Sequence, residues 1–209
     1  MSEIAQNIWA GLTTSTPLDQ LNLLLGLLGV GLMIRRSLWA FPVGLAAVTV
    51  QGVLFYRAAF PADAALQVFF FVTLAWGWRH WVKDRGAAPE LPVTTLSPRG
   101  LSLTLLAASA AMTVWALFVS PLIHSVMPWR DAFIAMFSVA AQVLQVRKKL
   151  ENWPLWVAVN AVAVVSYWSA ALAFTAVLYL IFLGMAFFGW YAWATSRREE
   201  ARHEGPAIP

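Results

Sequence analysis

The stretch NWPLWVAVN, residues 152–160, holds two tryptophans and an asparagine whose spacing suits a flat, polar ligand. Trp153, Trp156 and Asn160 stand at positions i, i+3 and i+7, which share one face of a helix. Indole faces stack on planar rings and attract cations, and a carboxamide exchanges hydrogen bonds. An interfacial belt is the alternative role, because tryptophan is enriched at membrane surfaces. This alternative weighs most on Trp153, which follows the basic run at residues 147–149. A belt role is also favoured over a ligand role for the tryptophans near the inner helix ends, Trp76, Trp78, Trp81, Trp190 and Trp193.

Amide side chains also lie inside apolar runs, where an amide without a partner is costly. Hydrogen bonding between helices is the alternative role of each, and we favour it for Gln142 and Gln145, near the inner end of a predicted helix. Gln67 and Asn160 are the better candidates for contacting a ligand. The amides concerned are Gln51, Gln67, Gln142, Gln145 and Asn160.

Asp63 and Asp131 each begin a predicted helix on the outer side of the membrane. A carboxylate at that position can cap the helix and interact favourably with the helix dipole. Capping is the favoured role, and we retain Asp63 among the candidate substrate-binding residues.

The sequence lacks the signatures of enzymes and of metal or cofactor sites. It has no His-Glu-x-x-His, Walker or Gly-x-Ser-x-Gly motif, and it has no cysteine. The histidines, His80, His124 and His203, are scattered along the chain. The glycine-rich GLLGVG lies within an apolar run, where it favours close helix packing. No catalytic residue, metal site or cofactor is therefore predicted.

Membrane-spanning helices must position the candidate residues. The chain is 60% hydrophobic and 11% charged, whereas a soluble domain carries about 25% charged residues. Its apolar runs are long enough to cross a ~30 Å hydrocarbon core, where a segment must satisfy its own backbone hydrogen bonds. We predict an all-α integral membrane protein with seven transmembrane helices, at residues 18–34, 38–56, 62–81, 101–120, 130–146, 154–172 and 174–195.

The basic residues predict the orientation. With the N-terminus outside and the C-terminus inside, 12 of the 14 Lys and Arg residues face the cytoplasm, and only Arg57 and Arg130 lie outside. The expected location is a bacterial inner membrane, crossed several times. The basic composition then reflects topology and contact with anionic lipid, and no nucleic-acid partner is expected.

The sequence contains an internal repeat, which is seen when the chain is aligned with itself so that Gly77 falls on Gly189. We call this shift the repeat offset. GWRHW at 77–81 then falls on GWYAW at 189–193, and Pro42 falls on Pro154. Each copy holds three predicted helices and one helix separates them, so both copies have the same orientation. This 3+1+3 parallel repeat is typical of SWEET-type transporters, with an axis along the membrane normal. The predicted parts are an N-terminal segment 1–17, a first repeat 18–81, a loop and linker helix 82–126, a second repeat 127–195 and a polar cytoplasmic tail 196–209.

The two copies differ at positions where a ligand would bind. Gln67 aligns with Tyr179, and Asn160 aligns with Val48. A ligand without two-fold symmetry requires such differences, and substrate sites in these folds lie near the midplane between the repeats. Tyr179 therefore joins the candidates, and transport is the leading functional hypothesis.

Three segments resemble PnuC-type vitamin transporters: PADAALQVFFFVTLAWGWRHW at 61–81, KKLENWPLWVAVNAV at 148–162 and FTAVLYLIFLGMAFFGWYAW at 174–193. The resemblance covers most of the chain, from about residue 21 to residue 193. It implies a SWEET-like fold in a homotrimer. It also implies uptake of nicotinamide riboside by facilitated diffusion, with phosphorylation in the cytoplasm trapping the product, while relatives carry thiamine or riboflavin.

The resemblance also assigns residues one by one. The tryptophans of its Trp-x-x-Trp motif fall on Trp153 and Trp156, its glutamine on Gln67 and its asparagine on Asn160. The chain departs mildly at Phe174, where many relatives have Leu before the threonine.

The leading hypothesis is thus a facilitative B-vitamin transporter, with nicotinamide riboside as the favoured substrate. The predicted spans contain no ionisable pair that would indicate proton coupling, and the chain has no nucleotide-binding loop that would indicate ATP use. Uniport is therefore the simplest mechanism. The alternatives are a thiamine or riboflavin transporter of the same family, a SWEET-type sugar transporter, and a membrane scaffold or sensor anchored by its tryptophans.

Overall fold

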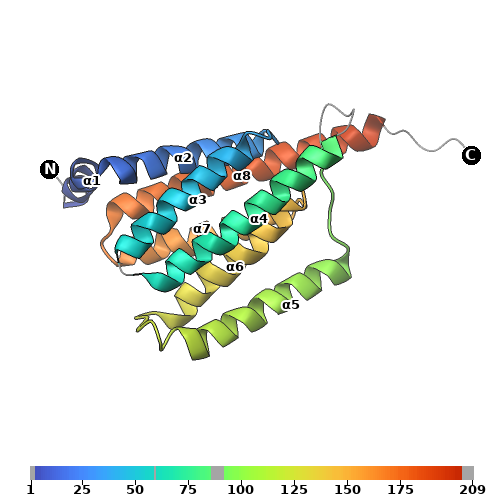
Figure 1. Cartoon of the computed structure of the whole chain (residues 1–209). Coiled ribbons are helices and arrows are strands. Elements are labelled where there is room, and N and C mark those ends of the chain that lie inside the picture. The colour runs from blue at the N-terminus through green and yellow to red at the C-terminus, as the bar shows by residue number, and fades with distance from the viewer. Residues whose placement is uncertain (1–2, 59, 86–91, 204–209) are drawn as a thin grey trace, which may run out of the picture.

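The structure, a computed structural model, describes residues 3–58, 60–85 and 92–203. Helices joined by short connections make up nearly all of these ranges (Figure 1), which confirms the all-α prediction. The helices are α1 (Glu3–Thr14), α2 (Pro17–Ile34), α3 (Ala40–Arg57), α4 (Pro61–Arg85), α5 (Pro98–Val114), a π-helical turn η1 (Trp115–Val119), α6 (Pro128–Val146), α7 (Asn152–Ser169) and α8 (Ala173–His203).

The structure supports a multi-pass membrane protein. Each of the seven predicted ranges falls on a helix, and within the described chain four helical segments are both long and apolar enough to cross a bilayer: Pro17–Ile34, Ala40–Arg57, Pro98–Val119 and Ala173–Arg202. Two features were not predicted. The N-terminal segment contains the short helix α1, which packs on α8, and α8 continues to His203, past the predicted end at residue 195 and into the predicted polar tail.

Local sequence signals set the helix ends. Thr16 caps α2, accepting a bond from the backbone N–H of Asp19 while the Asp19 carboxylate accepts one from the Thr16 backbone N–H. Pro17 follows at the first helical position, which needs no N–H donor. Ser97 and Pro98 start α5 in a similar way, since the Ser97 hydroxyl accepts from the Gly100 N–H. These caps fix where the apolar segments begin.

The same turn ends α2 and α6. Each turn has a residue in the left-handed region, Arg36 with φ 53° and Lys148 with φ 57°, and the repeat offset matches these two residues. The next N–H bonds back to a carbonyl inside the helix, as in a Schellman motif. These bonds join Ser37 to Leu32 at 3.0 Å and Lys149 to Leu144 at 2.9 Å.

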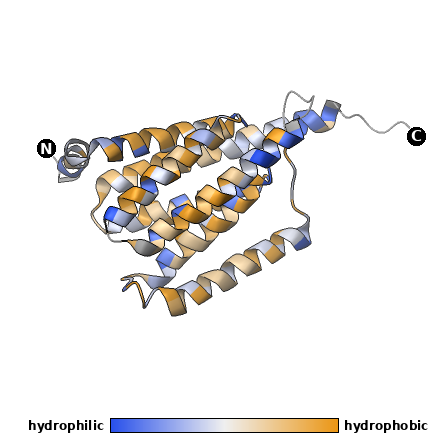
Figure 2. Cartoon of the chain, in the orientation of Figure 1, coloured by the Kyte–Doolittle hydropathy of each residue, from blue (hydrophilic) through white to orange (hydrophobic). Residues whose placement is uncertain are grey.

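The helices form one elongated bundle with a polar end. Helices α2, α3 and α4 lie together and α6, α7 and α8 lie together, whereas α5 lies to one side against α6 (Figure 1). Hydrophilic residues gather where α4 and α8 end, near the C-terminus of the described chain (Figure 2). The basic turns after α2 and α6 lie at this same end, because ion pairs tie them to α8 and α4. We call it the basic end.

Candidate functional site

A cavity of about 280 Å³ lies between the two groups of helices. Its size is near the lower limit of ligand sites, which range from about 300 to 1,000 Å³. Most of its wall is apolar, and few polar groups face it. The lining from the second half of the chain comprises Gln142, Gln145, Trp153, Trp156, Asn160, Tyr179, Phe182 and Ala186, opposite residues of α2, α3 and α4.

Positions matched by the repeat offset line this cavity from both halves of the chain, and their chemistry differs. The first half contributes apolar or small side chains, whereas the second half contributes most of the polar and large aromatic ones. A ligand in the cavity would therefore find its hydrogen-bond partners on the α6–α7 side. The matched positions are Val30 and Gln142, Met33 and Gln145, Gly44 and Trp156, Val48 and Asn160, Phe70 and Phe182, and Leu74 and Ala186.

Trp156 is the centre of a hydrogen-bonded set on this wall. Its Nε1 donates to Oε1 of Gln145 at 3.3 Å, across the α6–α7 interface. Its backbone carbonyl accepts from Nδ2 of Asn160 at 2.8 Å, one turn later. Within the described residues, no partner is found for Oδ1 of Asn160 or for Nε2 of Gln145. The set fixes the indole and leaves one acceptor and one donor beside the cavity.

Gln142 lies one turn before Gln145 and lines the same wall. Its side chain is buried, with the residue 6% exposed, and its Nε2 has no hydrogen-bond partner in the described structure. A buried amide left unpaired costs about 1–3 kcal/mol. The structure therefore corrects the role favoured from sequence for Gln142, since its amide nitrogen makes no bond between helices and borders the cavity.

Sequence reasoning thus overlooked Gln142 and Gln145 as cavity residues. The signal that could have found them was the asymmetry applied to Gln67: at the same offset, Gln142 matches Val30 and Gln145 matches Met33. Both glutamines stand opposite apolar partners in the other half of the chain.

Trp153 lines the cavity from a fully buried position, so the belt interpretation is wrong for it. Its ring packs edge-on against Trp193 on α8, with centroids 5.5 Å apart and planes at 86°. Gly189 makes room for this ring, because a Cβ at that position would lie 2.5 Å from ring atoms of Trp153. The close approach of α7 and α8 here depends on that glycine.

The remaining candidates are divided by the structure. Tyr179 lines the cavity and stacks on Tyr167, with centroids 5.1 Å apart. Gln67 lies on α4 against Gly52 of α3, and Asp63 lies in the first turn of α4. Neither of these two is among the residues that line the cavity. The structure therefore places Trp153, Trp156, Asn160 and Tyr179 on the cavity wall, whereas Gln67 and Asp63 are not part of that wall.

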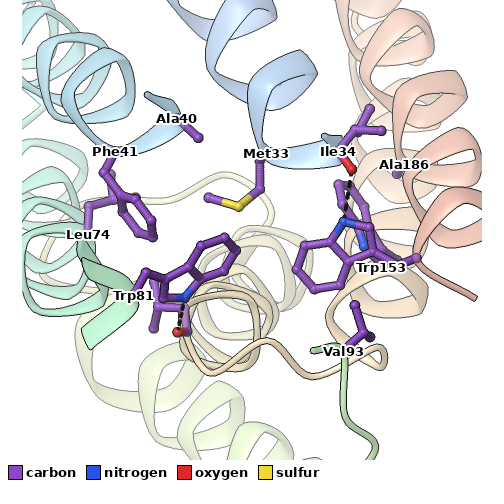
Figure 3. Close-up of a cluster of buried hydrophobic side chains, with 11 residues drawn as sticks. Met33, Ile34, Ala40, Phe41, Leu74, Trp81, Val93, Trp153 and Ala186 are labelled. Atoms are coloured by element: carbon purple, nitrogen blue, oxygen red, sulfur yellow. Dashed lines mark hydrogen bonds between the residues drawn. The ribbon is translucent and has the colours of Figure 1, made fainter. Parts of the chain in front are cut away.

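A cluster of buried hydrophobic residues adjoins the cavity (Figure 3), and its largest members are Phe41, Trp81, Trp153 and Trp193; we call it the aromatic cluster. Trp81 and Trp193 are 0% and 1% exposed, so the belt interpretation is wrong for them as well. Each indole donates to the carbonyl of a residue that ends a helix in the other half of the chain. Trp81 Nε1 bonds to Val146 at 2.8 Å, and Trp193 Nε1 bonds to Ile34 at 3.1 Å.

A second cavity, of about 560 Å³, lies at the basic end between α4 and the turn after α6. Its charged lining residues are Asp84, Arg147 and Lys148. Nζ of Lys148 lies 2.9 Å from Oδ2 of Asp84 and 5.5 Å from the centre of the Trp81 ring. The hydrogen bond and the charge of Lys148 hold the pKa of Asp84 below its ordinary value. This ion pair joins the two halves of the chain on the side of the aromatic cluster that faces away from the cavity.

The fold and the cavity define a helical, multi-pass membrane protein with an internal site between two groups of helices. The model of the nicotinamide mononucleotide transporter family matches residues 16–195, and the chain belongs to this family. The resemblance to PnuC-type transporters is thereby confirmed. Because the family consists of transporters, the protein is a transporter and not an enzyme.

Similar proteins agree with this assignment. The chain is 28% identical, over 83% of each sequence, to the nicotinamide riboside transporter PnuC of Escherichia coli. It is 29% identical to the riboflavin/roseoflavin transporter RibM of Streptomyces davaonensis, over 88% of this chain and 87% of that one. Its fold resembles the crystal structure of the vitamin B3 transporter PnuC, with a TM-score of 0.73 and 20% identity over 94% of this chain and 89% of that one.

Proposed function

We propose that the protein takes up nicotinamide riboside by facilitated diffusion and that the cavity described above is its binding site. The observation that carries the proposal is the wall formed by Trp156, Gln145 and Asn160, which offers an aromatic face between a hydrogen-bond donor and an acceptor. A pyridinium ring stacks on indole and gains from its charge. The nicotinamide carboxamide and the ribose hydroxyls supply both donors and acceptors.

The proposed binding residues are Trp153, Trp156, Asn160 and Tyr179, with Gln142 and Gln145 added from the structure. Asp63 and Gln67 remain proposals that rest on the sequence alone. They are the weaker members of the set, because neither is among the residues that line the cavity.

The proposed architecture is seven transmembrane helices, α2 to α8, in a SWEET-like 3+1+3 parallel repeat. The turns after α2 and α6 and the matched cavity positions support it, because both recur at the repeat offset found in the sequence. Rocking of the α2–α4 group against the α6–α8 group would alternate access to the cavity. The basic end would face the cytoplasm of a bacterial inner membrane.

Uniport suits the chemistry of the cavity wall. Among the described residues that line it there is no Asp, Glu, Lys, Arg or His, so no group there would carry a proton along with the substrate. A ligand moving down its gradient needs only two interconverting states. Phosphorylation in the cytoplasm would then trap the product, and the functional unit is proposed to be a homotrimer.

Riboflavin is the second candidate substrate, because the chain is as similar to the riboflavin/roseoflavin transporter RibM, at 29% identity, as it is to PnuC, at 28%. The cavity volume favours the smaller ligand, since a flavin has three fused rings and the nicotinamide riboside only one.

Tryptophan fluorescence of the purified protein tests the proposal. We expect nicotinamide riboside to quench it more strongly than thiamine or riboflavin, and Trp156→Ala and Asn160→Ala each to weaken binding by about 1–3 kcal/mol through lost stacking or a lost polar contact. Trp168→Ala, an exposed tryptophan on the same helix, is the control and should bind normally. A protein that responds to none of the three vitamins would refute the vitamin assignment.

A further inference from the structure

The two halves of the chain hold each other at the basic end by reciprocal hydrogen bonds. Trp81 on α4 donates to the carbonyl of Val146, which ends α6, and Trp193 on α8 donates to the carbonyl of Ile34, which ends α2. The repeat offset matches the two donors with each other, and it also matches the two acceptors. The two hydrogen bonds are therefore counterparts: each has, in its own half, the donor or acceptor position that the other has in the matched half.

Both acceptors are helix-end carbonyls that accept no hydrogen bond within the Schellman turns. The turn bonds use Leu32 and Met33 after α2, and Leu144 and Gln145 after α6, and for the carbonyls of Ile34 and Val146 the described structure gives only the indole as partner. Helix-end carbonyls are readily satisfied by water when the protein partner leaves. The two bonds can therefore break at modest cost if the basic end hydrates.

Two ion pairs also join the halves reciprocally, farther from the cavity than the two hydrogen bonds. Arg36 Nη1 lies 2.6 Å from Oε1 of Glu200 on α8, and Lys148 Nζ lies 2.9 Å from Oδ2 of Asp84 on α4. Arg36 and Lys148 are the left-handed residues of the two matched turns. Each half thus offers a basic side chain to an acid on the last helix of the other half.

Ring packing, in contrast, joins residues of the same half. Phe41 meets Trp81 edge-on at 5.0 Å, and Trp153 meets Trp193 edge-on at 5.5 Å, again at matched positions. Between the halves, Trp81 and Trp193 touch only with tilted rings 6.4 Å apart. If each half moves as a rigid body, the ring pairs stay intact while the hydrogen bonds and ion pairs between the halves break.

The aromatic cluster borders the cavity. Some of its buried members also line the cavity, namely Met33, Ala40, Leu74, Trp153 and Ala186. Trp81 and Trp193 belong to the cluster but are not among the residues that line the cavity.

From this arrangement we propose that Trp81 and Trp193 are gating residues: their two hydrogen bonds to Val146 and Ile34 hold the cavity closed toward the basic end, and both bonds break when the transporter opens on that side. The inference rests on the proposed transport function. The Arg36–Glu200 and Lys148–Asp84 ion pairs form the outer layer of the same gate.

Cysteine accessibility tests the gate without any substrate. Because the chain has no cysteine, Ala186→Cys gives a single reporter on the cavity wall, buried behind the gate. A membrane-impermeant maleimide is added to inside-out vesicles, which expose the basic end. Trp81→Phe with Trp193→Phe keeps the rings and removes both N–H donors, and we expect labelling of the reporter to become roughly tenfold faster.

Trp78→Phe with Trp190→Phe is the matched control. These tryptophans are also paired by the repeat offset, lie one turn before the gating pair and are partly exposed, so their replacement should leave the labelling rate unchanged. Ala201→Cys, exposed on α8 beyond the gate, shows that the reagent reaches this side. An unchanged Ala186→Cys rate in the monodisperse Trp81→Phe/Trp193→Phe protein would overturn the proposal, and so would rapid labelling of the reporter without these replacements.

A second variant covers the case in which the double tryptophan replacement does not fold. Asp84→Asn with Glu200→Gln removes the outer ion pairs at partly exposed positions and should speed labelling by a smaller factor. If this variant also leaves the rate unchanged, the gate is refuted. Vitamin binding is measured separately by fluorescence, so failure of the substrate assignment and failure of the gate give different results.

Discussion

At the scale of single residues, the cavity wall is complementary to a carboxamide. Asn160 uses its Nδ2 in a bond to the helix backbone, which leaves Oδ1 as an acceptor, whereas Gln142 leaves Nε2 as a donor. A carboxamide presents one donor group and one acceptor group on the same flat unit. Nicotinamide carries such a group, and its ring would lie against Trp156 on the same wall.

Replacing Gln142 by Met should separate stability from binding. The change removes an unpaired buried amide, so we expect the ligand-free protein to melt at an equal or higher temperature, while affinity for nicotinamide riboside falls by about 1–3 kcal/mol. Thermal unfolding in detergent and fluorescence titration measure the two effects. A large loss of stability with unchanged affinity would show that Gln142 acts only in folding.

The proposed binding residues could be predicted from sequence only in part. Trp153, Trp156 and Asn160 follow from helical spacing within one segment, so their common face needed no knowledge of the neighbours. Gln142 is a different case, because its role depends on which helix α6 faces. The tryptophans at the basic end were misjudged for a related reason: in lipid, an indole that faces the bilayer and one that faces the protein stand in equally apolar sequence.

At the scale of helices, small residues set how closely neighbours approach. Gly77 of α4 lies against Val146 of α6, and Gly189 of α8 lies against Trp153 of α7; a Cβ at either glycine would come within 3.0 Å of these side chains. The two glycines are matched by the repeat offset. The aromatic cluster therefore requires glycine at both positions.

Gly189→Ala should destabilise the protein by about 1–3 kcal/mol, the usual cost of overpacking a filled core. Its new Cβ would overlap the Trp153 ring, which is buried against Trp193. Gly184→Ala on the same helix is the control: nothing lies within 4 Å of the added atom, so the change should be neutral or slightly stabilising. Melting temperatures in one detergent compare them, and equal values would contradict the packing described for α7 and α8.

Helix positions were predicted well, because apolar runs of spanning length leave little choice of structure. The features that were missed obey other rules. Helix α1 has 12 residues, too few to cross a bilayer, so a search for spans passes over it. The continuation of α8 into a charged segment is stabilised by Glu200, which bonds Arg36 and the backbone N–H of Val93. Such long-range partners leave no pattern in the local sequence.

At the scale of the whole molecule, charge is divided between the two ends of the bundle. The turns after α2 and α6 and the ends of α4 and α8 are basic, whereas Asp63 and Asp131 begin helices at the opposite end. A bilayer with a negative inner surface favours the basic end on the cytoplasmic side.

Single cysteines should report this orientation. Ala201→Cys, exposed on α8, should react with an impermeant maleimide only in inside-out vesicles, and Leu122→Cys, exposed in the turn between η1 and α6, only in right-side-out ones. The positive-inside bias provides the reason. Labelling of both positions from the same side would contradict the predicted topology, and labelling with the sides reversed would invert the proposed direction of the gate.

The repeat divides two tasks along the length of the bundle. In the proposed mechanism, the halves make the closure where they match, at the tryptophans, their acceptor carbonyls and the left-handed turns. They contact the substrate where they differ, at Gln142, Trp156 and Asn160. Cargo preference can therefore diverge by substitution on one wall while the mechanics of opening stay untouched. Such modularity would allow two proteins that are 28% and 29% identical to this chain to be a riboside transporter and a flavin transporter, as their names state.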